Sequence, residues 1–225
     1  MAPHSRIYLT RHAQAEHNVD LDYSIPDAPL TPLGKQQAAA LAPKISSLQG
    51  SAHLIVTSPL KRTLQTTKLG WGPAVERLGI KNVICLPQAQ ECNAFPCDTG
   101  SAKSTLASDP EFEDFDLSLL TDDWTSKQDF YSEDRTAIAN RAKWVRHYLR
   151  DRPEENIVLV AHGDVLRQIT ASNRGPSGHM WQNAEVRIFE FDPEHVDGEA
   201  FLHQTEDVAA AGGYGPTSSS ADFDA

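Results

Sequence analysis

Two histidines and two arginines, drawn from three separate stretches of this sequence, are the side chains best suited to chemistry. Arg11 and His12 stand side by side in "LTRHAQAEHN", Arg62 lies in "TSPLKRTLQTT", and His162 lies in "VLVAHGDVLR". In each stretch the polar residues follow a short apolar run of the kind that forms a buried strand. Brought together, these four groups could bind an anion and attack it.

A phosphate is the simplest ligand for such a set. An arginine guanidinium presents a planar fork that can bind two phosphate oxygens at once. A neutral histidine can attack phosphorus because one of its ring nitrogens is unprotonated, and arginines stabilise the charge that builds up on the equatorial oxygens. The departing alkoxide also needs a proton, which a carboxylic acid with a raised pKa can supply.

Strands and helices alternate along the chain in the pattern expected of an α/β domain. Apolar runs predict strands at residues 6–10, 53–58, 82–87, 156–161 and 185–191. Helices are predicted to start near four residues that can cap a helix N-terminus, namely Thr31, Ser58, Ser132 and Asp164. Such alternation favours a mainly parallel sheet, whose ligands bind beyond the carboxyl ends of the strands. The histidines and arginines are therefore expected along one rim of the sheet.

The three stretches resemble the motifs of the histidine phosphatase superfamily, the phosphoglycerate mutase-like proteins. "RHAQAEHN" is similar to the first motif, an Arg-His-Gly with an asparagine six residues after the histidine, a place that Asn18 takes. The second motif, Ser-x-x-x-Arg-x-x-Gln-Thr, is matched by Ser58, Arg62, Gln65 and Thr66. In "VAHGDVLR", His162 and Gly163 match the histidine-glycine pair that follows a strand in the third motif.

This resemblance implies a three-layer α/β/α fold and a reaction through phosphohistidine that needs no metal or other cofactor. His12 would be the nucleophile, and the phosphate pocket would be completed by Arg11, Asn18, Arg62, His162 and Gly163. The family's acid is a carboxylate soon after the third strand. Glu91 in "LPQAQECNAFPCDTGS" is the best-placed candidate, and Asp98 or another carboxylate of the same region is the alternative.

Some residues depart from the pattern of the mutases in this family. Ala13 replaces the usual glycine, and Gln14 and Ala15 replace a glutamate and a serine or threonine. A mutase also holds a second phosphate and a carboxylate, for which basic residues are needed, whereas residues 105–134 carry ten acidic residues and one lysine. We therefore expect a phosphomonoesterase that hydrolyses a small organic phosphate, with phosphoryl transfer between sugar acids as the alternative.

Two further alternatives come from other classes of protein. A metallohydrolase could use His12, His17, His162 and Asp164, since histidine and aspartate are good metal ligands. The sequence contains no HExxH motif, however, and paired arginines would repel a cation. If it binds no metal, His17 is expected to lie in a solvated loop. An inactive module that binds a phosphorylated ligand would be expected to have lost one of the four central residues, and all four are present.

The long middle segment and the C-terminal segment differ in their aromatic content. Residues 88–134 show little periodicity but keep bulky aromatic side chains, among them Phe112, Phe115, Trp124, Phe130 and Tyr131. Disordered linkers are poor in such residues, so we expect an ordered insertion that forms a lid over the pocket. Residues 205–225 are acidic and rich in glycine and serine, and are expected to be disordered. This division gives one domain over residues 1–204.

Composition limits the partners and the compartment. The net charge of −11 excludes nucleic acid as an expected partner, because binding to its phosphate backbone needs a basic face. No apolar run approaches the roughly 20 residues that cross a bilayer. The N-terminus lacks the apolar core of a secretory signal, and three cysteines at no metal-like spacing suit a reducing compartment. A cytoplasmic enzyme for a small phosphate ester is expected, as a monomer or a homodimer.

Overall fold

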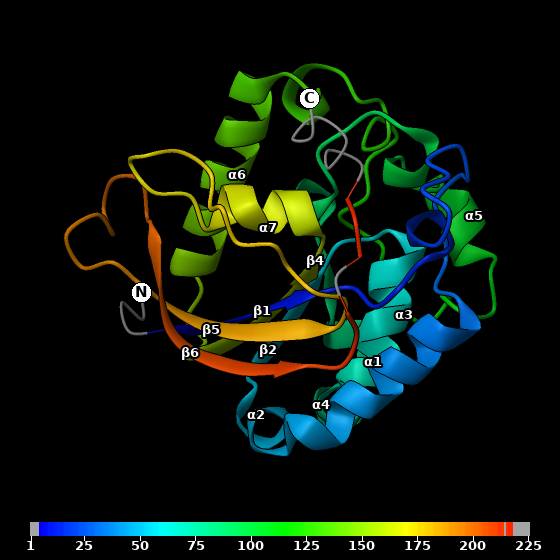
Figure 1. Ribbon diagram of the computed structural model, residues 1–225, viewed down its shortest axis with the longest axis horizontal. Helices are drawn as coiled ribbons and strands as arrows, with labels where there is room; N and C mark the ends of the chain where they lie inside the picture. Colours follow the sequence, from blue (N-terminus) through cyan, green and yellow to red (C-terminus); the bar gives the residue numbers. More distant parts are fainter. Residues whose placement is uncertain (1–4, 214, 218–225) are drawn as a thin grey trace.

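A single sheet with the strand order β3-β2-β4-β1-β5-β6 forms the centre of the computed structural model, which describes residues 5–213 and 215–217 (Figure 1). The pairs formed among β1 to β4 are parallel. At one edge of the sheet, β5 pairs antiparallel with β1, and β6 pairs antiparallel with β5. The strands of this sheet are β1 (Arg6–Arg11), β2 (Leu54–Thr57), β3 (Ile84–Cys85), β4 (Asn156–Ala161), β5 (Glu185–Phe191) and β6 (Leu202–Ala210).

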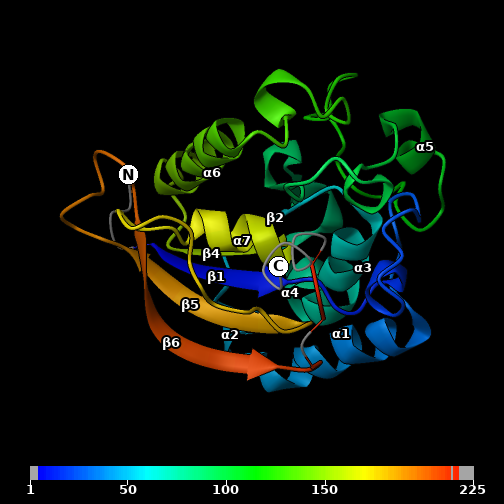
Figure 2. The same ribbon diagram turned by 45° about the horizontal axis from the view of Figure 1, so that its top comes forward.

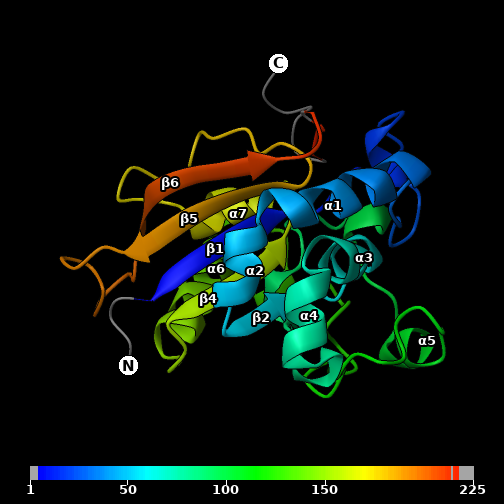
Figure 3. The same ribbon diagram turned by 90° about the horizontal axis from the view of Figure 1, so that it is seen from below.

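Helices cover both faces of the sheet, which confirms the predicted three-layer α/β/α fold (Figure 3). One face packs against α1 (Pro32–Lys44), α2 (Ser46–Ser51), α3 (Lys61–Gly70) and α4 (Gly72–Leu78). The other face packs against α6 (Arg135–Arg150) and α7 (Gly163–Ile169). Each central strand contributes to both cores, because alternate side chains point to opposite faces; Tyr8 belongs to the first core and Ile7 to the second.

Of the four residues predicted to cap a helix, only Thr31 is an N-cap. Thr31 does cap α1, and its side chain accepts a hydrogen bond from the Gly34 N–H. Ser58 does not cap α3, whose N-cap is Leu60, because the Ser58 hydroxyl lies 2.8 Å from Nε2 of His162 instead. Asp164 lies inside the first turn of α7, and His162 is the N-cap residue of that helix. Both helices lie where the sequence predicts them, but neither Ser58 nor Asp164 is the residue that caps its helix.

The helix predicted near Ser132 starts three residues later. Asp134 is the N-cap of α6, and its carboxylate accepts hydrogen bonds from the N–H groups of Thr136 and Ala137. No described helix is both long and apolar enough to cross a membrane.

Residues 88–134 are ordered, as their aromatic content predicts. They contain one short helix, α5 (Lys103–Ala107), and the side chains of Phe112, Phe115 and Trp124 are buried in the core shared with α1 to α4. Trp124 packs so closely over Gly100 that a Cβ atom at this glycine would lie 1.9 Å from the indole ring. Short 3-10 helices are found at Glu16–Asn18, Ile80–Asn82, Pro87–Ala89, Pro96–Asp98 and Asp129–Tyr131.

The prediction of a disordered segment from residue 205 is wrong for the first part of that segment. Residues 205–210 belong to β6, which pairs with β5 along its length. Most side chains of β6 are exposed, so the strand has no apolar alternation that a sequence pattern could reveal. Backbone hydrogen bonding to a strand that would otherwise be an exposed edge accounts for its order. The prediction for residue 214 and residues 218–225 lies outside the described residues.

Candidate active site

The carboxyl ends of β1 and β4 bring two of the predicted histidines together. In the parallel pairing Arg11 lies opposite Ala161, and the His12 N–H donates to the Ala161 carbonyl at 3.0 Å. The imidazole rings of His12 and His162 consequently lie 5.2 Å apart, measured between their centroids. His12 is 2% exposed and His162 is fully buried, so the site is shielded from solvent.

The His12 ring is fixed in one tautomer. Its Nδ1 lies 2.7 Å from the carbonyl oxygen of Ala13, and since a carbonyl can only accept, Nδ1 carries the proton. Its Nε2 is then unprotonated and accepts a hydrogen bond from Nε of Arg62 at 3.3 Å. Burial, followed by the charges of Arg62 and Arg11, lowers the pKa of His12 well below its usual value. The ring is therefore neutral at physiological pH, and the electron pair of Nε2 faces Arg62.

Arg62 joins this histidine to a buried carboxylate. Its Nη2 forms an ion pair with Asp98 at 3.0 Å, and its Nη1 donates to the Cys97 carbonyl at 2.5 Å. Both charged side chains are 1% exposed. Such a buried pair depends on both partners, because either charge alone would be costly to bury. The structure thus places Asp98, the alternative acid in the sequence analysis, as the ion-pair partner of Arg62.

Arg11 and Asn18, two more of the predicted phosphate-binding residues, are held by hydrogen bonds. Arg11 Nη1 donates to the Trp181 carbonyl at 2.5 Å. Asn18 Oδ1 accepts from the Ala15 N–H, and its Nδ2 lies 3.0 Å from Nε2 of His17. His17 is 3% exposed, so the expectation of a solvated loop histidine is wrong. Burial, with the charges of Arg62 and Arg11, lowers the pKa of His17 to about 2, and the neutral ring helps to orient Asn18.

The Glu91 carboxylate lies at the N-terminus of α7. It accepts hydrogen bonds from the N–H groups of Asp164 at 3.2 Å and Val165 at 2.9 Å, and from its neighbour Cys92 at 2.9 Å. These donors favour the charged form, but burial, followed by the charges of Asp164 and Asp98, raises the pKa of Glu91 to about 7. Glu91 can therefore hold a proton near neutral pH, next to the turn that begins with His162.

Two cations that the sequence analysis did not single out hold the backbone around Glu91. The guanidinium of Arg141 is fully buried and donates to the carbonyls of Gln88, Gln90 and Glu91. Lys127, the single basic residue of residues 105–134, donates from Nζ to the Glu91 carbonyl at 3.1 Å, and burial lowers its pKa to about 8. Arg141 interrupts the buried apolar stripe of α6. A charged residue at a predicted core position is a sequence signal that could have identified it.

Two of the four side chains proposed for a metal site, Asp164 and His12, contact arginines. Asp164 forms an ion pair with Arg167 at 3.5 Å, and Nε of Arg62 faces His12. Among residues 5–213 and 215–217 there is no group of three or more His, Cys, Asp and Glu side chains arranged to hold a metal ion.

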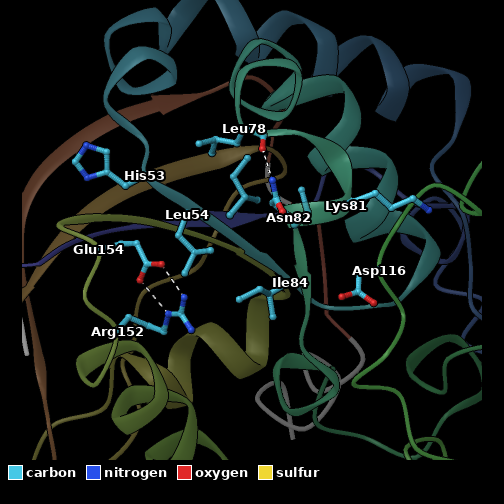
Figure 4. Close-up of a pocket in the computed structure, with 11 residues that line it drawn as sticks. His53, Leu54, Leu78, Lys81, Asn82, Ile84, Asp116, Arg152 and Glu154 are labelled. Carbon is cyan, nitrogen blue, oxygen red and sulfur yellow. Dashed lines mark hydrogen bonds and ion pairs between the residues drawn. The ribbon is translucent and has the colours of Figure 1, made fainter.

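A cavity of about 460 Å³ lies at the opposite end of the sheet, at the amino ends of β2 and β3 (Figure 4). Arg152 and Glu154 in its wall are paired with each other, and none of the predicted site residues lines it. Next to the predicted site, by contrast, the cavity beside Gly163 and Asp164 amounts to only about 10 Å³. The histidines and arginines are thus enclosed in this conformation.

Known proteins are similar to this chain over most of its length. A family profile described as histidine phosphatase superfamily (branch 1) matches residues 7–201. A probable phosphatase of Schizosaccharomyces pombe is 28% identical over 165 residues, which cover 72% of this chain and 75% of that protein. Phosphoglycerate mutase-like protein 1 of Arabidopsis thaliana is 30% identical over 194 residues, or 71% and 68% of the two chains. A crystal structure of phosphoserine phosphatase from Entamoeba histolytica, in complex with 3-phosphoglyceric acid, has the same fold, with a TM-score of 0.55 and 23% identity over 92% and 98% of the chains.

Proposed function

Because the chain belongs to the histidine phosphatase superfamily, we propose that it is a phosphomonoesterase that hydrolyses a small organic phosphate through a phosphohistidine at His12. The observation that carries this proposal is the state of the His12 ring. Nδ1–H is held by the Ala13 carbonyl, the pKa is lowered by burial, and Nε2 faces the guanidinium of Arg62. A nucleophile of this kind needs no base to activate it.

In the first step, Nε2 of His12 forms a bond to phosphorus while the bond from phosphorus to the ester oxygen breaks. Arg11, Arg62 and His162 lie around the attacking nitrogen, where positive charge and hydrogen-bond donors stabilise the equatorial oxygens. A bound phosphate would compete with Asp98 for the Arg62 guanidinium, whose charge this ion pair balances.

Glu91 would supply the proton that the leaving oxygen needs. Its raised pKa keeps a share of the carboxyl groups protonated near neutral pH. In the second step water attacks the phosphohistidine, the carboxylate takes the proton from that water, and inorganic phosphate leaves with His12 restored.

Hydrolysis is favoured over phosphoryl transfer between sugar acids. Residues 105–134 carry ten acidic residues, and Lys127 is the one cation among them. A site for a second phosphate would need more positive charge than this. The name of the S. pombe relative agrees with hydrolysis, and that of the A. thaliana relative keeps mutase activity as the competing outcome.

The test is to trap the intermediate. The protein, its His12→Ala variant and a His53→Gln control are mixed with ³²P-labelled phosphate ester and quenched in alkali, in which phosphohistidine survives. His53 is an exposed histidine at the far end of the sheet, so its replacement should leave labelling unchanged. Labelling should vanish with His12→Ala, and the product should be inorganic phosphate. Labelling that persists in this variant would overturn the mechanism, and transfer of the label to an added sugar acid would indicate a mutase.

A further inference from the structure

The last described residues of the chain, 215–217, lie across the candidate active site. After β6 the chain returns to the carboxyl end of β1 and the first turn of α7 (Figure 2). The Pro216 carbonyl accepts a hydrogen bond from Nδ2 of Asn18 at 2.8 Å, and the Thr217 carbonyl accepts one from the Tyr23 hydroxyl at 3.1 Å. The segment therefore uses a donor, Asn18, that the sequence motif assigns to the phosphate pocket.

Thr217 lies directly beside the place where a phosphate would bind. A Cβ atom built on Gly163 would lie 2.4 Å from the Thr217 methyl group and 3.4 Å from Nε of Arg11. The space left between Gly163, Asp164 and Thr217 is about 10 Å³, about one water-sized probe. The alcohol part of an ester bound to His12 thus has no room while Thr217 is in place.

The carboxylate of Asp164 indicates which chemical group a ligand in this space would carry. Its side chain is 7% exposed, and its Oδ1 accepts a hydrogen bond from the Thr217 hydroxyl at 3.0 Å and pairs with Arg167. Its Oδ2 is buried and has no hydrogen-bond partner among the described residues. A buried carboxylate oxygen without a donor is costly, and a ligand that brings a second hydroxyl would satisfy it.

We propose that residues 215–217 occupy the subsite for the alcohol part of the substrate and leave it when substrate binds. Once the segment has left, Asp164 selects an alcohol that bears further hydroxyl groups, such as a polyol or a sugar. The Thr217 hydroxyl on Asp164 takes the place of a substrate hydroxyl. This inference rests on the proposed phosphatase function for its kinetic readout, but its binding readout is independent of turnover.

The first experiment compares two esters that differ only in hydroxyl groups, glycerol 1-phosphate and propyl phosphate. The unaltered protein should prefer glycerol 1-phosphate in kcat/KM by roughly 10- to 100-fold, the effect of a hydrogen bond to a charged acceptor. Asp164→Asn should reduce this preference severalfold or more. The change also alters the charge next to Glu91, but that effect is shared by both esters and cancels in the ratio. A ratio that stays the same in the variant would overturn the role of Asp164.

The second experiment measures binding of glycerol 1-phosphate by calorimetry in the His12→Ala background, in which no ester is turned over. In this background a chain that ends at Gly213 should bind the ester several times more tightly than the full chain, and Thr217→Val should lie between them. Equal or weaker binding by the shortened chain would show that the segment does not compete for the site. If no ester is hydrolysed at all, the proposed function fails, and the binding series still decides whether the segment and the ester exclude each other.

Discussion

Nε of Arg62 donates a hydrogen bond to Nε2 of His12 at 3.3 Å, while the same guanidinium is paired with Asp98 through Nη2. One arginine thus connects the unprotonated ring nitrogen to a buried carboxylate. The ring is kept neutral because burial disfavours its charged form and because a second positive charge beside Arg62 is also disfavoured.

Replacing Arg62 should affect both stability and activity. Arg62→Met removes the guanidinium that balances the charge of the buried Asp98 carboxylate, which should destabilise the fold by about 3–5 kcal/mol. Asp98→Asn in the same chain should recover a large part of the loss, because the buried negative charge is gone, whereas activity should stay low in both variants. Chemical denaturation of the two single variants and the double variant measures the coupling; strictly additive effects would contradict a direct interaction.

Glu91→Gln should separate the two halves of the reaction. An aliphatic alkoxide leaves poorly without a proton, so turnover of an alkyl phosphate should fall by roughly 10²–10⁴-fold. A nitrophenolate leaves without much help, so p-nitrophenyl phosphate should give a rapid burst of nitrophenol followed by slow turnover. Stopped-flow absorbance records both phases. Equal and small effects on the two substrates would mean that Glu91 is not the acid.

The first step should be fastest on the acidic side of neutrality. The protonated form of Glu91 is needed, and its pKa is raised to about 7, so the rate on an alkyl phosphate should fall as pH rises through about 7. The pKa of His12 is lowered, chiefly by burial, so the nucleophile stays neutral and the rate persists at pH values where an ordinary histidine would be protonated. Single-turnover rates across the pH range test this, and the basic limb should be absent in Glu91→Gln. A rate that rises through pH 7 would reverse the assigned roles.

No metal ion should be required for activity. The charge of the phosphate would be met by Arg11, Arg62 and the donors around them. Turnover should therefore survive prolonged treatment with EDTA, and orthovanadate should inhibit by imitating the transferred phosphoryl group. Activity that is lost in EDTA and returns with Zn²⁺ or Mn²⁺ would instead support the metallohydrolase.

Arg141 should act through the position of Glu91. Its guanidinium holds three carbonyls of residues 88–91, and a lysine cannot reach all three. Arg141→Lys should lower kcat on alkyl phosphates more than on p-nitrophenyl phosphate and should move the basic limb of the pH profile. Arg77→Lys is the matched control, since Arg77 also donates to two carbonyls, those of Gln49 and Ala52, but away from the site. Equal losses in both variants would indicate a general effect on folding.

Local patterns in the sequence were sufficient to locate β1 to β5, whereas β6 was missed. The strand with the clearest apolar run, β4 at Asn156–Ala161, was predicted to the residue, because burial on both faces leaves a clear signature, while β2 and β3 are shorter than predicted. The parallel arrangement then required Arg11, His12 and His162 to meet at the carboxyl ends of neighbouring strands. Each of these inferences depends on neighbours in sequence and on the geometry of a parallel sheet.

Tertiary structure alone decided the contacts between segments that no sequence period relates. The pairing of Asp98 with Arg62, the burial of His17 and the position of Glu91 at the α7 N-terminus depend on how loops fold back over the sheet rim. The same holds for the hydrogen bond from Thr217 to Asp164, because these residues are 53 positions apart in the sequence. The side chains in these contacts are polar, and a polar residue in a loop has the same local pattern whether water or a buried charge becomes its partner; only the path of the whole chain determines which.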